Sequence, residues 1–387
     1  MKVALVICHY DAQGGGAERW TDRHARWLLQ HDFEVHLIAH RFRGAPDGAV
    51  CHLVQRRWWE PRKLGFARAV ERFLASTEFE IVHDMGDGWA GDVIMPHHGT
   101  RRGSQQQNLR LMHPSVRWIR SLSYLMVPRY LEFAALERRK YDEWDRKLFI
   151  AVSSMVGENM HRFHGIPRER IRVVYNGVNV DRFAPSRDQA IRQHTRIELG
   201  VPEDETMFLH VAHNFRLKGL DALLKAVSNL KKQGHSAHLI VVGDGQISKY
   251  ERLARQLGVE DLVRFTGDQP DPMPYYHAAD VFVLPTYYDP CSLVVLEAMA
   301  CGLPVITTRN NGVHELMKDG QEGFIIDQPE DLESLTRGMI QLLDPIRRGE
   351  AGRAARALAE RHSIERNCKE QVAVYEDFIN SNGYSAT

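Results

Sequence analysis

The sequence predicts an α/β protein with two doubly wound domains, each built on a parallel sheet. Short apolar segments alternate with amphipathic helical patterns along the whole chain, and this alternation is typical of βαβ units. A stretch rich in Asn, Gly and Pro divides the alternation into two series. The chain has 387 residues, of which 43% are hydrophobic, so it is long and apolar enough to form two hydrophobic cores.

The first series begins with a strand over residues 2–8, KVALVIC. A helix follows directly, and its Trp20, Trp27 and Leu28 fall on one face at helical spacing. A basic and aromatic insert of about residues 100–146 interrupts the alternation. The other strands expected in this half are 34–40, 79–84, 147–154 and 171–178.

Residues 175–185, YNGVNVDRFAP, have the composition of a linker and end the first series. We therefore expect a first domain over residues 1–178 and a second over 179–362. The segment 363–387 follows them and contains one more amphipathic helix. The strands expected in the second domain are 206–213, 238–245, 263–268, 281–286, 304–308 and 323–327.

Composition and charge exclude several classes of protein. Lys and Arg together number 50, as do Asp and Glu, so no overall positive field draws in nucleic acid. The five cysteines contain no CxxC pair, which favours buried thiols in a reducing compartment over disulfides or a zinc site. The N-terminal apolar run is too short for a signal peptide, and no window approaches the ~20 apolar residues that span a bilayer. We expect a cytoplasmic protein.

The segment GGGAER (14–19) lies between the first strand and the helix that follows it. Glycines such as Gly15 and Gly16 let the backbone approach a ligand, and a helix N-terminus favours negative charge. The segment is not GxGxxG, and His40 rather than an acid ends the second strand, so a dinucleotide fingerprint is absent. From these residues alone, a turn that only reverses the chain fits equally well.

A second candidate segment, HNFRLKGLD (213–221), follows the first strand of the second domain. Its Arg216 and Lys218 precede a helix and could face a diphosphate. Basic residues between a strand and a helix are usually only solvated. Their position at the carboxyl end of a strand, where open α/β sheets bind ligands, favours a functional role.

The segment YYDPCSLVVLEAMACGLPVITT (287–308) places one carboxylate, Glu297, in an apolar helix. Ser292 is a suitable N-cap, and Gly302 stands where a left-handed residue ends a helix. Burying Glu297 without a partner is costly, so it either faces solvent, pairs with a structural arginine or binds the hydroxyls of a ligand. Asp289 precedes the helix by a few residues. The free amides of Leu293 and Val294 could then point at a phosphate between the two acids.

With these segments in this order, the chain resembles the retaining glycosyltransferases of the GT-B fold, family 4, and within them the lipopolysaccharide-core glucosyltransferases. The resemblance implies two Rossmann-like domains that face a cleft, the first on the acceptor side and the second binding a nucleotide sugar. It also implies a C-terminal helix that crosses back to the first domain, for which Val372, Tyr375 and Ile379 form a suitable face. The alternative is a helix that only closes the second domain. The matching segments are GGGAER, PHHG (96–99), VYNGVNVDRF, HNFRLKG, VVGDG, ADVFVLPT and DPCSLVVLEAMACGLPVITT.

The resemblance also assigns roles to residues. By the family's E-x7-E motif, Glu297 binds the nucleotide ribose. Asp289 contacts the donor sugar, and it is a shorter acid than the family's usual residue. Lys218 matches the diphosphate-binding lysine, whereas His213 replaces the usual arginine, whose charge Arg216 could supply. His98, more than His97, falls where the family has a polar residue at the cleft. The catalytic set is therefore His98, Arg216, Lys218 and Asp289, and the donor-binding set is Gly15, Gly16, Arg216, Lys218, Asp289, Ser292, Leu293, Val294 and Glu297.

The implied reaction is transfer of a hexose, with retention, from a nucleotide diphosphosugar such as UDP-glucose. The implied acceptor is a glycan or glycolipid of the bacterial cell envelope, such as the lipopolysaccharide core. The sequence has no DxD motif, so we expect no metal and no other cofactor. Two alternatives remain. One is a nucleotide-sugar 2-epimerase. The other is a non-catalytic nucleotide-sugar-binding protein, which is compatible with the differences from the family's usual residues at Asp289 and His213.

The basic insert suggests one further partner. Residues 109–140 mix aromatic and apolar residues with seven Lys or Arg and only two acids, Glu132 and Glu137. A helix of this composition can lie in the headgroup region of an anionic membrane, on its cytoplasmic side. Alternatively, its apolar residues pack on the first domain and its arginines face solvent or an anionic acceptor. The apolar residues concerned are Trp118, Ile119, Leu122, Leu125 and Met126.

Overall fold

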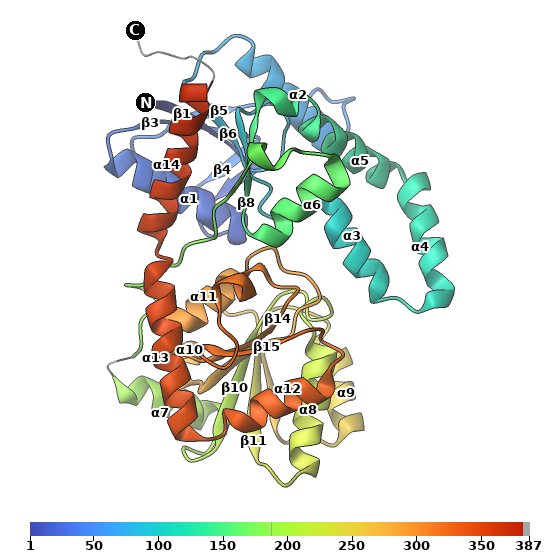
Figure 1. The fold of residues 1–387 in the computed structure, drawn as a ribbon, viewed down its shortest axis with the longest axis vertical. Helices are drawn as coiled ribbons and strands as arrows, with labels where there is room; N and C mark the ends of the chain where they lie inside the picture. The colour runs from blue at the N-terminus through green and yellow to red at the C-terminus, as the bar shows by residue number, and fades with distance from the viewer. Residues whose placement is uncertain (187, 382–387) are drawn as a thin grey trace. The chain divides into compact units, whose positions relative to one another are not determined.

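The computed structural model of the chain describes residues 1–186 and 188–381, without the side chains of Pro114 and Leu125. The chain forms two compact units (Figure 1). The first comprises Met1–Tyr175 together with the C-terminal segment from Glu365, and the second comprises Asn176–Ile364. The sequence placed these boundaries after 178 and after 362. The last part of the predicted C-terminal segment, residues 382–387, lies outside the described residues.

The described part of the first unit contains a parallel sheet of seven strands, in the order β5-β3-β1-β6-β7-β8-β9. Val6 of β1 is in register with Ile38 on one side and with Asp84 on the other, and the strand order reverses at this point. Ligands of such sheets bind beside the reversal, at the carboxyl ends of the strands. The strands are β1 (Lys2–Val6), β3 (Glu34–Ala39), β5 (Val50–Leu53), β6 (Ile81–Asp84), β7 (Val93–Ile94), β8 (Leu148–Ala151) and β9 (Ile171–Val173), with a separate short pair of β2 (His9–Asp11) and β4 (Arg41–Arg43).

The helix predicted after the first strand is confirmed as α1 (Gly16–Gln30). Trp20, Trp27 and Leu28 are all buried on its inner face, because helical spacing places them over the sheet. The other helices of the first unit are α2 (Arg62–Leu74), α3 (Arg101–Arg110), α4 (Pro114–Met126), α5 (Pro128–Tyr141), α6 (Ser154–His164) and α14 (Ile364–Ser381).

The second unit has a parallel sheet of six strands in its described residues, in the order β12-β11-β10-β13-β14-β15. The strand order reverses between β10 and β13, where Phe208 is in register with Val281. The predicted fold class, an α/β protein with two doubly wound parallel domains, is confirmed. The strands are β10 (Thr206–Val211), β11 (Ala237–Val242), β12 (Val263–Gly267), β13 (Val281–Leu284), β14 (Val305–Thr308) and β15 (Gly323–Ile326). The helices are α7 (Gln189–Leu199), α8 (Leu220–Lys232), α9 (Ile247–Leu257), α10 (Met273–Ala278), α11 (Leu293–Ala300), α12 (Leu332–Gln341) and α13 (Pro345–Arg361).

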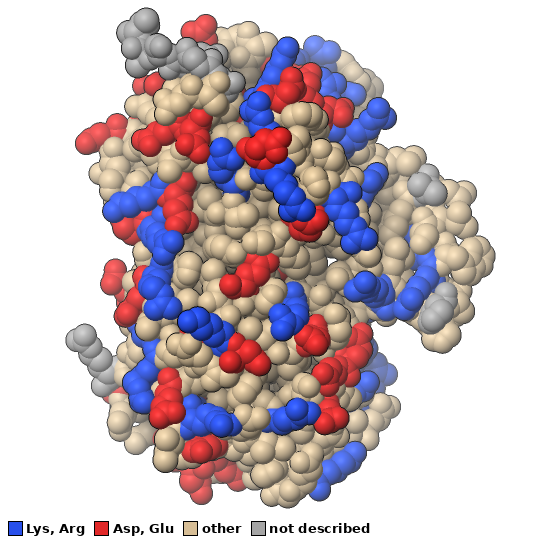
Figure 2. Space-filling model, viewed as in Figure 1, with Lys and Arg blue, Asp and Glu red and all other residues tan. Residues whose placement is uncertain are grey.

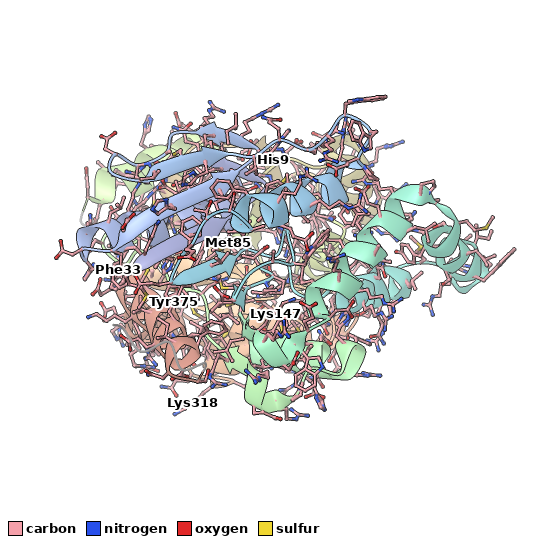
Figure 3. The ribbon with its side chains drawn as sticks, turned by 90° about the horizontal axis from the view of Figure 1, so that it is seen from above. His9, Phe33, Met85, Lys147, Lys318 and Tyr375 are labelled. Carbon is pink, nitrogen blue, oxygen red and sulfur yellow. The ribbon has the colours of Figure 1, made fainter. Side chains whose placement is uncertain are left out.

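The basic insert forms three helices, α3, α4 and α5, and α4 stands away from the sheet of the first unit in both ribbon views (Figures 1 and 3). Residues 101–131 contain no Asp or Glu. On the face in Figure 2 this lobe accordingly shows only basic and uncharged side chains. Trp118 is 60% exposed and Met126 is 74% exposed, so these apolar residues of α4 do not pack on the first unit. None of the described helices is long and apolar enough to cross a membrane.

The C-terminal helix α14 packs within the first unit, beside α1 (Figure 1). The indole Nε1 of Trp20 donates to Oδ1 of Asn367 over 3.0 Å. Tyr375 is buried as predicted, but Val372 and Ile379 are only half-buried, so the predicted face was wrong by about one residue. The sequence missed this because polar side chains take part in the contact. The buried residues of α14 are Asn367, Cys368, Gln371, Val374, Tyr375 and Phe378.

A buried histidine cluster joins α14 to α1 and β6. Nε2 of His24 lies 2.8 Å from the hydroxyl of Tyr375, and Nδ1 of His83 lies 2.6 Å from the same hydroxyl. Nδ1 of His24 lies 3.4 Å from Sγ of Cys368, and the ring of His97 packs against Trp20 at a tilt of 56°. Burial lowers the pKa of His24 from 6.5 to about 3, and burial lowers the pKa of His83 as well.

We predict that this cluster makes the protein sensitive to acid. His24 stays neutral in the folded state, whereas in the unfolded chain it is protonated below pH 6.5, so the free energy of unfolding falls as the pH drops from about 6.5 toward 3. The loss from this one group is about 2 kcal/mol at pH 5. Urea unfolding at pH 7 and pH 5 should therefore show a smaller loss in His24→Leu than in wild type. The exposed His194→Leu serves as the control and should lose as much as wild type.

Candidate functional site

The helix α11 stands beside the strand-order reversal of the second unit. Ser292 occupies its N-cap position, but its side chain makes no capping hydrogen bond, so this part of the prediction was wrong. Its backbone N–H instead donates to Oδ1 of Asn311 over 3.3 Å. The amides of Leu293 and Val294 belong to the first turn, where helical N–H groups have no partner within the helix. Gly302 has a φ of 80°, as predicted for the residue that ends the helix.

Glu297 is buried on α11, with 4% of its surface exposed, so the interpretation that it faces solvent is wrong. The hydroxyl of Tyr276, on α10, donates to its Oε2 over 3.2 Å. A neutral donor of this kind holds the carboxylate in place without neutralising its charge. The same hydroxyl lies 3.4 Å from the carbonyl oxygen of Val294, so Tyr276 contacts both Glu297 and the first turn of α11.

Asp289 precedes α11 and is also buried, with 9% of its surface exposed. Its Oδ2 lies 2.6 Å from Nζ of Lys218, so the two form an ion pair between residues that are far apart in the sequence. The backbone of Asp289 is fixed on both sides, since its N–H donates to Asn310 (2.9 Å) and its carbonyl accepts from Gly312 (2.9 Å). The structure therefore brings together two residues that the sequence assigned separately.

The loop that carries Lys218 ends at Gly219, where it passes very close to the backbone of Pro285. Gly219 has a φ of 77°, and a Cβ there would lie 1.8 Å from the carbonyl oxygen of Pro285, so only glycine fits. The N–H of Tyr287 donates to the carbonyl of Leu217 over 2.8 Å, which ties this loop to the segment after β13. Arg216 lies on the same loop and is exposed. The loop thus holds Lys218 next to Asp289 and leaves Arg216 reaching outward.

Asn311 is a residue of this site that the sequence analysis missed. Its Oδ1 accepts from the N–H groups of Ser292 (3.3 Å) and Val313 (3.2 Å), and its Nδ2 donates to Thr307 over 3.0 Å. It therefore links the start of α11 to the end of β14. The signal was present in the sequence as Asn-Asn-Gly directly after a strand, a pattern typical of a structured turn.

The first unit has a cavity of about 350 Å³ at the carboxyl ends of its central strands. Residues that follow β1, β6 and β7 line it, together with the start of α1. His9 and Met85, labelled in Figure 3, mark two of these strand ends. The cavity therefore occupies the position where a doubly wound sheet binds a ligand.

The two adjacent histidines of PHHG differ in their surroundings. His98 is exposed and lines the cavity, as expected for a residue that meets a ligand. His97 also borders the cavity, but its ring packs against Trp20 at 4.7 Å between centroids, and burial lowers its pKa to about 3. The preference for His98 over His97 stays a prediction.

The glycine segment forms the start of α1 at the edge of this cavity. Gly15 is the N-cap, with φ −67° and ψ −174°, and Gly16 is the first helical residue. A Cβ on Gly15 would meet the carboxylate end of Glu18 at 2.9 Å, which is a flexible side chain. Neither position therefore needs glycine for its backbone angles. Whether glycine is needed here for the approach of a ligand stays a prediction.

Three charged residues of the cavity were not predicted from the sequence. Asp87 lies 3.3 Å from Nζ of Lys63, and its other oxygen accepts from the N–H of Cys8 over 2.9 Å. Lys140 is buried and donates to the carbonyl of Gly86 over 2.5 Å, and burial lowers its pKa. The segment Asp-Met-Gly-Asp-Gly after a strand could have indicated Asp87. Nothing local marks Lys63 or Lys140, because they come from α2 and α5.

Comparison with known proteins assigns both units. The family model "Glycosyl transferases group 1" matches residues 191–357, and "Glycosyltransferase Family 4" matches residues 14–182. The two doubly wound domains, together with these two matches, are those of a GT-B glycosyltransferase. The chain belongs to the glycosyltransferases of family 4 type that these two models describe.

Two relatives illustrate the similarity in sequence. D-inositol 3-phosphate glycosyltransferase of Corynebacterium kroppenstedtii is 33% identical over 254 residues, which is 63% of this chain and 55% of that protein. The lipopolysaccharide glucosyltransferase WaaG of Escherichia coli is 30% identical over 214 residues, 55% of this chain and 57% of WaaG. The matched part thus spans little more than half the length of these relatives.

Solved structures match over nearly the whole chain. A crystal structure of WaaG, a glycosyltransferase involved in lipopolysaccharide biosynthesis, has a TM-score of 0.80 at 23% identity and covers 96% of this chain and 99% of its own. Anabaena HepE in complex with UDP-glucose has a TM-score of 0.68 at 18% identity and covers 100% of both chains. At these identities the likeness establishes the fold alone.

Proposed function

We propose that the protein transfers a hexose, with retention, from a nucleotide diphosphosugar to a glycan or glycolipid acceptor. UDP-glucose is the proposed donor and the lipopolysaccharide core the proposed class of acceptor. The observation that carries the proposal is the ion pair of Lys218 with Asp289 beside the strand-order reversal of the second unit, followed in the chain by the buried Glu297 of α11. The glucosyltransferase WaaG among the relatives and UDP-glucose in the HepE structure support the choice of donor.

The proposed roles follow from charge and position. Glu297 accepts the ribose hydroxyls and Asp289 a hydroxyl of the donor sugar. Lys218 and Arg216 stabilise the charge that develops on the leaving diphosphate, together with the amides of Leu293 and Val294. Because Lys218 contacts Asp289 over 2.6 Å before any donor binds, donor binding divides its charge between the carboxylate and the phosphate. Ser292 contributes its position at the helix start.

The reaction breaks the bond from the anomeric carbon to the diphosphate oxygen and forms a bond from the acceptor hydroxyl oxygen on the same face of the sugar. The departing phosphate oxygen takes the proton of that hydroxyl, so no separate base is needed. His98 lines the cavity of the first unit, where we place the acceptor and the sugar being transferred, and Gly15 and Gly16 directly precede the α1 residues that line it. Because cationic side chains and amides supply the positive charge, the proposal includes no metal and no other cofactor, and transfer should survive chelation by EDTA.

A thermal-shift screen of nucleotide diphosphates and their sugars tests the donor, because a ligand that binds only the folded state raises the melting temperature. A UDP-release assay with and without lipopolysaccharide-core acceptors then separates the alternatives. Transfer gives UDP only with an acceptor. A 2-epimerase gives an altered sugar without one, and a binding protein gives neither. A screen in which no nucleotide sugar raises the melting temperature would contradict the proposal.

We also propose that the protein works at the cytoplasmic face of a membrane, through α4. Trp118, Ile119, Leu122 and Met126 are exposed there among arginines, in a segment without acids. Such a surface suits an anionic headgroup region, where each basic residue adds about 1 kcal/mol.

Co-sedimentation with vesicles is expected to increase with the fraction of anionic lipid and to fall with salt. The variant Arg117→Glu, Arg120→Glu should bind less, whereas the control Arg68→Glu, Arg162→Glu carries the same change in charge away from α4 and should bind like wild type. Equal loss in both variants would show that overall charge, not α4, governs binding. Absence of binding to strongly anionic vesicles at low salt would leave α4 as a scaffold for the acceptor pocket.

A further inference from the structure

A second cavity of the first unit, of about 710 Å³, adjoins the one that contains His98. The two cavities share Cys8, His9, Lys63 and Phe133 in their walls. We name the second cavity the basic pocket, because five cationic side chains line it. They are Arg41 of β4, Arg56 of the segment before α2, Arg62 and Lys63 at the start of α2, and Arg129 of α5.

Among the described residues, Glu132 is the only acid that lines the basic pocket. Its Oε1 accepts from the backbone N–H groups of Lys63 (2.5 Å) and Leu64 (3.1 Å). Glu132 therefore caps the N-terminus of α2, which has no side-chain cap of its own.

The lysine of the pocket has an ionic partner, but the four arginines do not pair with carboxylates in the described structure. Lys63 lies 3.3 Å from Asp87. Arg56 uses one nitrogen on the backbone carbonyl of Glu60, at 2.8 Å, and Arg129 lies over the ring of Phe133 at 5.8 Å. Within residues 1–186 and 188–381, no ion pair involves Arg41 or Arg62. Four guanidinium groups that converge on one cavity without counter-charges repel one another, and an anion in the cavity relieves that repulsion.

We propose that the basic pocket binds a phosphate group of the acceptor, so that the enzyme selects acceptors that carry a phosphomonoester or a pyrophosphate. This inference rests on the proposed function, since it names the class of acceptor for the same site. Arginine is the side chain best suited to phosphate, because its planar fork donates two parallel hydrogen bonds. A phosphate also carries more negative charge than a single carboxylate, which matches a pocket with four unpaired arginines.

The shared wall gives the phosphate a positioning role. A sugar in the cavity beside His98 can extend its phosphate past His9 and Lys63 into the basic pocket, because these residues border both spaces. The phosphate would then fix which hydroxyl of the acceptor faces the donor. It acts through binding and orientation and does not take part in bond breaking.

The test compares two triple variants that change the net charge equally. Arg41→Gln, Arg62→Gln, Arg129→Gln removes three cations of the basic pocket. The matched control, Arg43→Gln, Arg68→Gln, Arg138→Gln, removes one exposed arginine from each of the same three elements, β4, α2 and α5, outside the pocket. Isothermal titration of the full chain with inorganic phosphate, pyrophosphate, D-glucose 6-phosphate and D-glucose gives the affinities.

Wild type and the control triple should bind the three phosphorylated probes but not D-glucose, and more weakly at high salt. The pocket triple should bind these probes at least tenfold more weakly. Equal affinity in wild type and the pocket triple, or no binding of any phosphorylated probe by wild type, would overturn the proposal. If the pocket triple fails to fold, Arg41→Gln and Arg62→Gln as single variants should each show a severalfold loss of affinity, and two unchanged affinities would overturn it.

Two further measurements separate the source of the phosphate and the proposed function. Titration with vesicles containing phosphatidic acid tests a lipid headgroup as the source. If the pocket triple bound the vesicles more weakly than wild type but bound the soluble probes equally well, the assignment to a sugar phosphate would be overturned. Affinity for UDP reports on the second unit and should be the same in both triples. Absence of UDP binding by wild type would count against the proposed function while leaving the phosphate result intact.

Discussion

Replacing Lys218 by alanine is expected to lower the rate of transfer by about a hundredfold to a thousandfold, the range typical for loss of one group that stabilises charge in the transition state. Lys218 is half-buried against Asp289, so its charge acts where water is partly excluded. In the variant the leaving diphosphate loses that charge, and Asp289 becomes an unpaired carboxylate near it. Both effects disfavour the developing negative charge. The measurement is kcat for UDP release with a saturating acceptor.

Two further variants identify the origin of this loss. Lys225→Ala removes an exposed lysine of α8 in the same unit and should leave kcat unchanged. Arg216→Ala should slow transfer less than Lys218→Ala, because Arg216 is exposed and solvent screens its charge. A neutral effect of Arg216→Ala would assign the second cationic position to another residue, such as His213. A kcat of Lys218→Ala within a fewfold of wild type would rule out its role in leaving-group stabilisation.

Replacing Glu297 by alanine is expected to weaken UDP binding by about tenfold to a hundredfold. The loss of a charged hydrogen-bond acceptor costs about 1.5–3 kcal/mol, and each 1.4 kcal/mol corresponds to a tenfold change in affinity. Glu297 is buried and held by Tyr276, so its carboxylate needs no rearrangement to meet the ribose. Calorimetric titration with UDP measures the effect.

Conservative changes at the same place separate a binding role from a structural one. Glu297→Gln keeps one acceptor oxygen and should retain part of the affinity for UDP. Tyr276→Phe removes only the hydroxyl that orients the carboxylate, so its loss should be smaller than that of Glu297→Ala. Unchanged UDP affinity in Glu297→Ala, with the melting temperature of wild type, would show that the carboxylate does not bind the nucleotide.

Local patterns account for the elements that the sequence predicted correctly. The helix over α1 follows from the spacing of Trp20, Trp27 and Leu28, and the end of α11 follows from Gly302, which has the expected positive φ. The predictions that depended on side-chain orientation were less accurate. Ser292 does not cap α11 with its hydroxyl, whereas its backbone N–H donates to Oδ1 of Asn311, a residue that follows β14. The buried face of α14 is shifted because it contains polar residues that pair with α1.

The sequence by itself determined the alternation of strands and helices, although not the strands β2, β4, β5 and β7, together with the resemblance to GT-B glycosyltransferases and the candidate acids and cations. These features depend on residues close together in the chain, which local periodicity and turn chemistry reveal. The tertiary structure alone decided which of those residues meet. Lys218 contacts Asp289, and Tyr276 holds Glu297, only because the strand order in a parallel sheet brings separate loops to one edge. The basic pocket has the same origin, since β4, α2 and α5 lie far apart in the chain, and no local pattern indicates that their arginines line one cavity.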